Sequence, residues 1–231
     1  MRRITPMNDK PKLSELRRNY GEKALNESEM CADPIQQFEC WFQEVLTQGF
    51  DDPTAMVLST VDTSGLPDSR VLLLKGIESE GFLFYTNYHS AKGLQLEQNP
   101  HAAMNFYWPS MCRQVRVRGR IIRISSTQSA AYFSSRPRAS QISAIASLQS
   151  QAIPSRMFLE MACHTVAQQY THQVIPCPSH WGGYLLLPDY IEFWQGRDDR
   201  LHDRVMYTRC NKDQKSDMNV ECAWSLSRLA P

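Results

Sequence analysis

The chain begins with a polar, charged stretch in which apolar residues show no sustained period. A short helical candidate from Leu13 to Tyr20 is the exception. High polarity without periodicity is typical of a loop or a disordered segment. We therefore expect a mobile N-terminal arm over residues 1–33 and one folded domain over residues 34–231.

An amphipathic helix is predicted to follow, from Pro34 to about Thr47. Asp33 is a suitable N-cap, and a proline in the first helical turn loses no hydrogen bond because that N–H has no intrahelical partner. Four apolar side chains at helical spacing would form the face that packs on the core: Phe38, Trp41, Val45 and Leu46.

From Ala55 the pattern becomes that of β-strands. Ala55–Val61 and Ser69–Lys75 are aliphatic runs joined by the turn-rich Asp62-Thr-Ser-Gly-Leu-Pro67, which predicts a hairpin. Further strands are predicted at Phe82–Thr86, Ala102–Trp108, Gln114–Arg120, Gly183–Leu187, Tyr190–Gln195, Arg204–Arg209 and Glu221–Leu226. In Gln114–Arg120, Gln114 and three arginines alternate with valines, so one face should be buried and the other wet or ligand-bearing.

Helices are predicted between these strands. Ser90 can cap a short helix that Asn99-Pro100 ends, and three more helices are expected at Ser126–Ser134, Pro137 to about Ser150 and Pro154 to about His172. These short strands with few parallel crossovers indicate an α+β fold, an antiparallel barrel with added helices.

Composition excludes several classes of protein. Lys+Arg 25 against Asp+Glu 24 gives a net charge of +1, so no overall basic field favours nucleic acid. No apolar run approaches the ~18 residues that a membrane helix needs. The seven cysteines are scattered without a C-x-x-C, and the histidines lack metal-ligand spacing, which argues against a disulfide framework or a metal site. We expect a cytoplasmic protein that binds neither nucleic acid nor membrane nor metal.

Three segments combine cations with hydroxyl groups and aromatic rings, as a site for a phosphorylated planar ring would. Arg70 and Lys75 would face opposite ways on a regular strand and serve two phosphates, or they are edge charges that reach solvent. Tyr132, Arg136 and Ser140 are spaced by four near a helix start, which fits either a phosphate site or a helix cap.

The third segment, Glu192–Arg204, is the densest, and places Trp194, Arg200, His202 and Arg204 on a predicted strand, turn and strand. Trp194 could pack beside a flat ring while Arg200 and His202 reach its polar substituents. Motifs for dinucleotide-binding Rossmann folds, P-loops, zinc proteases and α/β-hydrolases do not occur.

Together these segments resemble the pyridoxine/pyridoxamine 5′-phosphate oxidase family, from about Leu13 to Arg228-Leu-Ala-Pro231. The motifs that carry the resemblance occur in family order: Asp52-Pro-Thr-Ala-Met-Val, Arg70–Lys75, Phe84-Tyr-Thr-Asn87, Arg113-Gln-Val-Arg-Val, Ser135-Arg-Pro-Arg, Trp181-Gly-Gly, Phe193-Trp-Gln-Gly and Arg200-Leu-His-Asp-Arg204. The resemblance implies a homodimeric split β-barrel that binds flavin mononucleotide (FMN), with residues 34–231 as the oxidase domain.

The resemblance also implies a site built from both subunits. FMN would be bound by Arg70, Val71, Leu72, Leu73, Leu74, Lys75, Tyr85, Thr86, Lys92, Gln114, Gln149, Ser150, Trp194 and Arg204. The substrate would be bound by Arg17, Tyr20, Lys75, Tyr132, Arg136, Ser140, Arg200 and His202, with Arg17 to Tyr20 closing the site as a lid.

Two positions depart from the family pattern. Ser90-Ala91-Lys92 stands where the family has Ser-Arg-Lys, so one cation expected near the FMN phosphate is absent. Ser140-Gln-Ile-Ser143 stands where the family has Ser-Gln-Ile-Gly.

The implied activity is oxidation of pyridoxamine or pyridoxine 5′-phosphate to pyridoxal 5′-phosphate, with molecular oxygen reduced to hydrogen peroxide. Arg200 and His202 are the candidate catalytic residues. Guanidinium stays protonated, so Arg200 would orient and stabilise, whereas His202 would either accept a proton or only donate a hydrogen bond. The alternatives are a non-catalytic flavin or pyridoxal-phosphate binding protein on the same fold, and a flavin reductase, which would leave Tyr132 and Arg136 without a role.

Overall fold

The β-branched and aromatic runs form a strongly curved antiparallel sheet in the computed structural model, which describes residues 19–210 and 223–231. Within those residues the sheet has nine strands: β1 (Ala55–Val61), β2 (Pro67–Leu73), β3 (Gly76–Glu78), β4 (Gly81–Asn87), β5 (His101–Trp108), β6 (Arg113–Arg123), β7 (Trp181–Gln195), β8 (Asp203–Arg209) and β9 (Trp224–Leu229). The strand order is β2-β1-β5-β6-β7-β4-β3, with β8 and β9 added beside β7.

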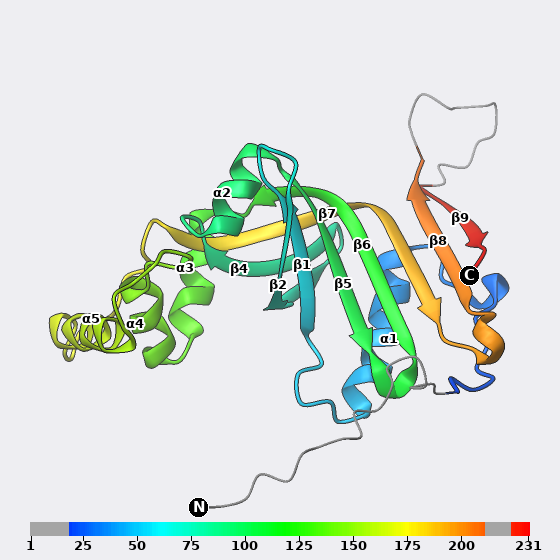
Figure 1. The fold of residues 1–231 in the computed structure, drawn as a ribbon, viewed down its shortest axis with the longest axis horizontal. Helices are drawn as coiled ribbons and strands as arrows, with labels where there is room; N and C mark the ends of the chain where they lie inside the picture. Colours follow the sequence, from blue (N-terminus) through cyan, green and yellow to red (C-terminus); the bar gives the residue numbers. More distant parts are fainter. Residues whose placement is uncertain (1–18, 211–222) are drawn as a thin grey trace, which may run out of the picture.

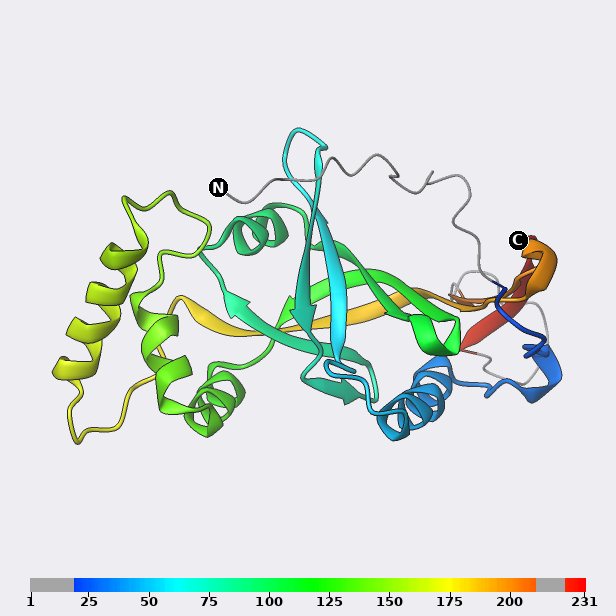
Figure 2. The same cartoon turned by 60° about the horizontal axis from the view of Figure 1, so that its bottom comes forward.

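Five α-helices flank this sheet (Figures 1 and 2): α1 (Pro34–Thr47), α2 (Ala91–Gln98), α3 (Ser126–Ser135), α4 (Arg138–Ala146) and α5 (Arg156–Gln169). Helices α3, α4 and α5 gather at one end of the molecule, and β8 and β9 lie at the other. The α+β antiparallel class expected from the pattern is therefore confirmed. No helix in the described ranges is long and apolar enough to span a membrane.

Helix α1 closes the core, and its N-terminus is built as expected. The Asp33 carboxylate accepts a hydrogen bond from the Ile35 N–H at 2.8 Å. The fully buried Phe38 meets Phe82 and Phe106 edge to face, with ring centroids 4.8 and 4.9 Å apart. This packing holds the helix against the concave side of the sheet.

One residue expected on that buried face is not there. Leu46 is 47% exposed, and Phe42 packs inward instead, stacked on Phe38 with centroids 5.8 Å apart. Phe42 is four residues from Phe38 and so lies directly above it, whereas Leu46 is rotated about 100° from the buried Val45. The prediction for Leu46 was wrong.

Strand β7 also differs from expectation, because a single strand replaces the two predicted on either side of Pro188. A register shift opposite Arg118 and Gly119 absorbs the proline. A Cβ atom on Gly119 would lie 2.0 Å from the Leu187 carbonyl oxygen, so only glycine admits this approach. The resulting strand runs the length of the sheet.

Several element ends are displaced from their expected positions, and β3 was not predicted. Strand β2 ends at Leu73 rather than Lys75, β9 spans Trp224–Leu229 rather than Glu221–Leu226, and α4 ends at Ala146 rather than near Ser150. Helix α5 occupies Arg156–Gln169 within the longer expected helix. These ends are set by tertiary contacts that local pattern does not contain.

The expected N-terminal arm falls partly outside the described residues, which begin at position 19. Residues 19–33 contact the end of the molecule that carries β8 and β9. Leu25 is buried, and its N–H donates to the Asp203 carboxylate at 3.0 Å. The boundary between arm and domain at residue 33 stays a prediction, and Arg17 lies outside the described residues.

Candidate functional site

A buried cation lies at the start of α2, beside the ends of β4 and α4. Lys92 is 7% exposed, and its ammonium group donates to Ser90 Oγ at 3.2 Å and to Gln149 Oε1 at 3.0 Å. Thr86 Oγ1 donates to the same amide oxygen at 3.2 Å. Burial, and then the nearby charge of Arg70, lower the pKa of Lys92. These acceptors are neutral, so an added anion would find a desolvated charge to neutralise.

Arg70 of β2 extends toward the same helix. Its guanidinium donates to Thr60 Oγ1 at 2.6 Å, to the Asp68 carboxylate at 2.5 Å and to Gln95 Oε1 at 3.3 Å. Lys75 follows the end of β2 and is exposed, so the expected opposite facing of Arg70 and Lys75 on one regular strand does not apply.

The four residues between Arg70 and Lys75 divide between surface and interior. Val71 and Leu73 are 66% and 38% exposed, while Leu74 is buried and Leu72 packs against the core. Two apolar side chains in the open on an edge strand are available to a ligand or to another chain.

Arg136 and three aromatic rings, Tyr85, Tyr132 and Trp181, form another group of side chains in the candidate site. Tyr85 and Tyr132 stack with centroids 3.9 Å apart, and Tyr85 stacks on Trp181 at 5.4 Å. The Arg136 guanidinium lies over the Trp181 ring, 4.7 Å from its centroid. We call Arg70, Lys92, Tyr85, Tyr132, Trp181 and Arg136, with their neighbours Thr86 and Gln149, the phosphate-side cluster.

One atom of this cluster is left without a partner. Arg136 Nη1 is buried and has no hydrogen-bond acceptor among the residues that the structure describes. Burial lowers the pKa of the Arg136 guanidinium and raises that of the Tyr132 phenol, so Tyr132 stays neutral and can donate. Buried donors are rarely left unsatisfied, and an unmade bond of this kind indicates a ligand position.

Ser140 lies in the first turn of α4, partly exposed. The alternative that Tyr132, Arg136 and Ser140 cap a helix start is wrong, because the N-cap of α4 is Pro137 and no side chain caps that helix. Ser150 follows α4 with a positive φ of 72° and is exposed, outside the helix that was expected to contain it.

The Trp181-Gly-Gly motif explains how α3 reaches this cluster. A Cβ atom on Gly182 would lie 2.0 Å from the Tyr88 hydroxyl, and one on Gly183 would lie 2.5 Å from Ile124 Cδ1. The Gly183 N–H donates to Ser129 Oγ of α3 at 3.1 Å. Sequence reasoning noticed this motif but did not assign Trp181 to the site.

A second group, which we call the ring-side cluster, lies where β7 ends and β8 begins. The Trp194 and His202 rings are 4.8 Å apart, and Tyr20 meets them edge to face at 5.9 and 5.3 Å respectively. The Arg197 backbone N–H donates to His202 Nδ1 at 3.1 Å. Because a backbone N–H can only donate, the neutral His202 ring must carry its proton on Nε2.

The turn that carries Arg200 is strained. Asp199 and Arg200 have φ values of 53° and 60°, in the left-handed region that non-glycine residues seldom adopt. Such residues cost on the order of 1–3 kcal/mol each and are typical of functional loops. Arg200 is exposed, and we find no ion pair for it in the described part of the chain.

Arg204 is placed differently from Arg136, because a buried carboxylate already neutralises it. Glu192 is 1% exposed and accepts from Arg204 Nε at 2.8 Å and from Arg116 Nη1 at 3.0 Å. Burial raises the pKa of Glu192, but hydrogen bonds from Arg204 and Tyr190 outweigh it and hold that pKa below its usual value. Gln114 pairs with Trp194 in the register of β6 and β7.

The two clusters do not meet within one chain. Trp181 and Trp194 stand at opposite ends of β7, thirteen residues apart. At about 3.3 Å per residue the path along the strand is about 40 Å. Figures 1 and 2 agree that the ends of β7 lie at opposite ends of the molecule. One planar ligand therefore cannot touch both clusters of the same chain.

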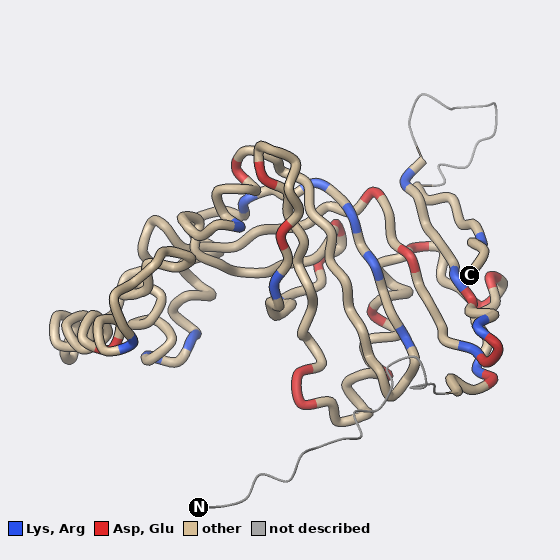
Figure 3. The backbone as a smooth tube through the Cα atoms, viewed as in Figure 1, with Lys and Arg blue, Asp and Glu red and all other residues tan. Residues whose placement is uncertain are grey.

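Charged residues are distributed along the chain as Figure 3 shows. Basic residues follow the exposed face of β6, where Arg116, Arg118 and Arg120 alternate with buried residues as the pattern predicted. Among the described residues no group of histidine, cysteine or carboxylate side chains could hold a metal ion.

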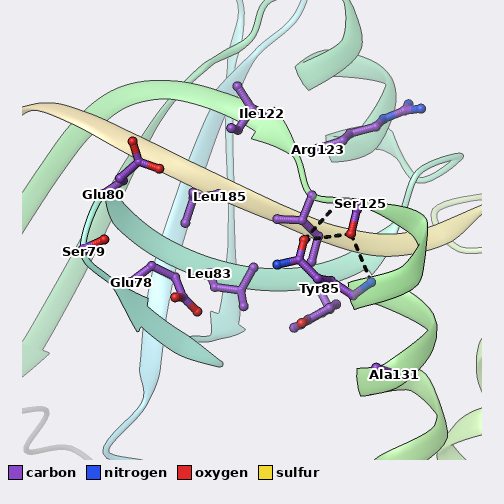
Figure 4. A pocket seen from close by; sticks show the side chains of 12 residues that line it. Glu78, Ser79, Glu80, Leu83, Tyr85, Ile122, Arg123, Ser125, Ala131 and Leu185 are labelled. Atoms are coloured by element: carbon purple, nitrogen blue, oxygen red, sulfur yellow. Dashed lines mark hydrogen bonds between the residues drawn. The ribbon is translucent and has the colours of Figure 1, made fainter.

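A cavity of about 580 Å³ lies next to the phosphate-side cluster (Figure 4). Its wall is formed by the β3–β4 turn, the end of β6 and the start of α3. Of the predicted site residues only Tyr85 lines it. Burial and the neighbouring Tyr132 and Glu78 raise the pKa of Tyr85, which keeps its phenol neutral.

Comparison with known proteins gives two family models in chain order. Residues 42–170 match "Pyridoxamine 5′-phosphate oxidase", and residues 181–231 match "Pyridoxine 5′-phosphate oxidase C-terminal dimerisation region". A pyridoxine/pyridoxamine 5′-phosphate oxidase of Legionella pneumophila is 55% identical over 95% of this chain and 97% of its own length. That of Paraburkholderia phytofirmans is 48% identical over 95% and 99%.

Solved structures share the fold at lower identity. PhzG from Burkholderia lata, in complex with tetrahydrophenazine-1-carboxylic acid, has a TM-score of 0.82 at 24% identity and covers 92% of this chain and 100% of its own. A pyridoxamine 5′-phosphate oxidase-related, FMN binding protein from Nostoc punctiforme has a TM-score of 0.66 at 20% identity, covering 87% and 100%. The fold is the split barrel that both share.

Glu192 generates a prediction about pH and stability. Because its pKa is lowered in the folded state, its stabilising effect is present above the unfolded value of about 4.3 and is lost as pH falls below it. Glu192→Gln should lower the free energy of unfolding by about 1.5–3 kcal/mol at pH 7, the usual worth of a hydrogen bond to a charged group. The gap between variant and wild type should shrink at pH 3.5.

Urea unfolding at both pH values, at one protein concentration, measures this gap. Glu160→Gln, which breaks an exposed pair with Arg156 on α5, is the matched control and should change little at either pH. An equal gap at pH 7 and pH 3.5 would show that the Glu192 charge contributes nothing.

Proposed function

The chain belongs to the pyridoxamine 5′-phosphate oxidase family, and from this membership we propose that it oxidises pyridoxamine or pyridoxine 5′-phosphate to pyridoxal 5′-phosphate with FMN as cofactor. The observation that carries this function is 45–55% identity over at least 95% of the chain to relatives named pyridoxine/pyridoxamine 5′-phosphate oxidase. The chain covers 97% and 99% of the length of the relatives from Legionella pneumophila and Paraburkholderia phytofirmans.

The phosphate-side cluster fits the FMN phosphate. A dianion beside Lys92 would give this desolvated ammonium the opposite charge that its neutral acceptors lack, and Arg70 lies close enough to Lys92 to share the anion. We assign the phosphate to Arg70 and Lys92 and the neighbouring contacts to Tyr85, Thr86 and Gln149. Val71–Leu74, Lys75 and Ser150 complete this half of the cofactor site.

The substrate phosphate is assigned to Arg136, Tyr132, Ser140 and Lys75. The buried and unpartnered Arg136 Nη1 supports this assignment, since a phosphate oxygen would supply the missing acceptor. Tyr132 is held neutral and can donate its hydroxyl hydrogen to the same group.

The ring-side cluster of the partner subunit would complete the site. The distance along β7 supports this, because Trp194, Arg200 and His202 are too far from Arg136 of their own chain to share one substrate. Gln114 and Arg204 join them on the cofactor, and the match of residues 181–231 to a dimerisation region supports a homodimer. Tyr20, against Trp194 and His202, belongs to the lid that Arg17 would extend.

When bound, FMN supplies the acceptor for the hydride equivalent that leaves C4′ of the substrate. The residues of this chain bind and orient. Arg200 stays protonated and contributes position and charge rather than proton transfer. His202 acts as a donor through Nε2–H, because its Nδ1 already accepts from the Arg197 N–H. Of the two roles left open for His202, hydrogen-bond donation is the one this geometry favours.

Molecular oxygen is the proposed final electron acceptor, with hydrogen peroxide as product. The proposed location is the cytoplasm, which the free thiols of the six described cysteines support.

The purified protein should be yellow, dimeric and able to convert both phosphorylated vitamers with one peroxide per pyridoxal 5′-phosphate. An absorbance spectrum, light scattering and a coupled peroxide assay with pyridoxamine 5′-phosphate measure these properties. A flavin-loaded dimer that forms neither product would instead be a binding protein.

Arg136→Ala should raise KM for pyridoxamine 5′-phosphate by about tenfold or more, because a charge-assisted phosphate contact is worth roughly 1.5–3 kcal/mol. Unphosphorylated pyridoxamine is the matched control, since its kcat/KM should not depend on Arg136. An unchanged KM for the phosphorylated substrate would remove Arg136 from the site.

Ala91→Arg should tighten FMN binding, because residue 91 is the first residue of α2 and adjoins Lys92. A partly exposed arginine–phosphate contact contributes about 1–2 kcal/mol, which is several-fold to somewhat more than tenfold in affinity. The gain should shrink at high salt.

Titration of apoprotein with FMN at two salt concentrations measures this effect. Gln98→Arg, at the other end of α2, adds the same charge away from the phosphate and serves as control. Equal dissociation constants for wild type and Ala91→Arg at low salt would mean that residue 91 does not reach the phosphate.

A further inference from the structure

The ring-side cluster depends on an ion pair between the buried Asp203 and the half-exposed Arg228, neither of which belongs to the cluster. His202 is held by Trp194, Tyr20 and the Arg197 N–H. The turn between Arg197 and His202 contains two left-handed residues, so it needs contacts from outside to keep its shape. The next residue, Asp203, provides them.

Asp203 joins three separate segments through one carboxylate. It is 8% exposed, and its Oδ2 accepts from the Leu25 N–H at 3.0 Å and from Arg197 Nη1 at 3.4 Å. Its Oδ1 accepts from Arg228 Nη1 of β9 at 2.6 Å. Arg197, whose backbone N–H orients His202, is therefore anchored to Asp203 through its side chain.

Arg228 carries the connection to the N-terminal segment. Its guanidinium donates to both Glu27 carboxylate oxygens at 2.6 Å and to the Leu25 carbonyl oxygen at 2.8 Å. Tyr20 and Gly21 of the same segment donate their N–H groups to the Asp198 carboxylate at 2.9 Å. One end of the segment is thus tied to the turn that carries Arg200, and the other end is tied to Asp203 and Arg228.

We propose that Asp203 and Arg228 are positioning residues, which set the ring orientation and tautomer of His202 and the placement of Arg200 and Tyr20 without contacting substrate. This inference rests on the proposed function for its kinetic consequence only. Its structural consequence is the Nε2–H tautomer of His202, which follows from the Arg197 hydrogen bond whatever the reaction is.

Loss of either partner should release the Arg197 contact. Asp203→Asn removes the charge at constant shape, and Arg228→Gln removes the guanidinium at a half-exposed position. Arg228→Lys keeps one charged contact with Asp203 and should recover part of the loss. Arg156→Gln, which breaks an exposed pair on α5, is the matched control.

Activity should be measured on the FMN-loaded dimer as kcat per bound flavin. Asp203→Asn and Arg228→Gln should lower kcat/KM by about 10- to 100-fold, with kcat itself reduced, because displacing a reacting group by about 1 Å is worth that much. Arg156→Gln should match wild type. A fall in melting temperature with kcat per flavin unchanged in both variants would overturn the proposal.

A spectroscopic readout separates this inference from the proposed function. In protein labelled with ¹⁵N-histidine, two-bond ¹H–¹⁵N spectra report which ring nitrogen carries the proton, and His202→Asn identifies the His202 signal. Wild type should show the Nε2–H form, and Asp203→Asn and Arg228→Gln should show averaging between tautomers. An unaltered His202 signal in both variants would overturn the positioning role even if the enzyme is active. If the His202 signal changes in both variants but the wild-type protein has no oxidase activity, the positioning role stands and the proposed function is rejected.

Discussion

Strand β7 is the constraint on which both halves of the site depend. Its first residue, Trp181, supports Tyr85 and Arg136, and Trp194 near its end supports His202. The strand pairs with β4, β6 and β8, so its course through the curved sheet is fixed along its whole length. Because an extended strand cannot shorten, the two clusters are held apart by backbone geometry. In the proposed site each chain therefore supplies two half-sites but no complete one.

The arginines that stabilise the fold differ from the cations proposed to bind a ligand, because only the former are neutralised by a carboxylate. Arg204 and Arg228 are matched by Glu192 and Asp203, at 2.8 and 2.6 Å. Arg136 has a buried donor without an acceptor in the described part of the chain, and Lys92 donates only to neutral oxygens. Burying a charge without a counter-charge is costly, which is why we assign Arg136 and Lys92 to the proposed ligand phosphates. Arg204, although assigned to the cofactor, already has its counter-ion and would act while anchored to Glu192.

Local pattern located most of the elements and the order of the site motifs, but not their assembly. Alternation along β6 correctly separated buried valines from exposed arginines, and Asp33 capped α1 as expected. Pattern failed where tertiary contact decides: Pro188 lies inside a strand because Gly119 opposite it leaves room, and Leu46 is exposed because Phe42 is the better neighbour of Phe38. Trp181 escaped assignment because its role is to support Arg136 and Tyr85 by stacking, and sequence does not show which ring lies under which cation. The counter-charges of Arg204 and Arg228 were hidden for the same reason.

The placement of the ring-side cluster joins dimer formation to ligand binding. Trp194, Arg200 and His202 all lie within residues 181–231, the segment that matches a dimerisation region. The residues proposed to contact the ring are therefore carried by the segment proposed to join the subunits. A ligand bound between the phosphate-side cluster of one subunit and the ring-side cluster of its partner binds the dimer and not the separated chains. By mass action such a ligand stabilises the dimer, and a mutation that shifts the chains toward monomer lowers the apparent affinity for the cofactor. In a split site of this kind, the fraction of sites that hold cofactor reports how far the subunits have assembled.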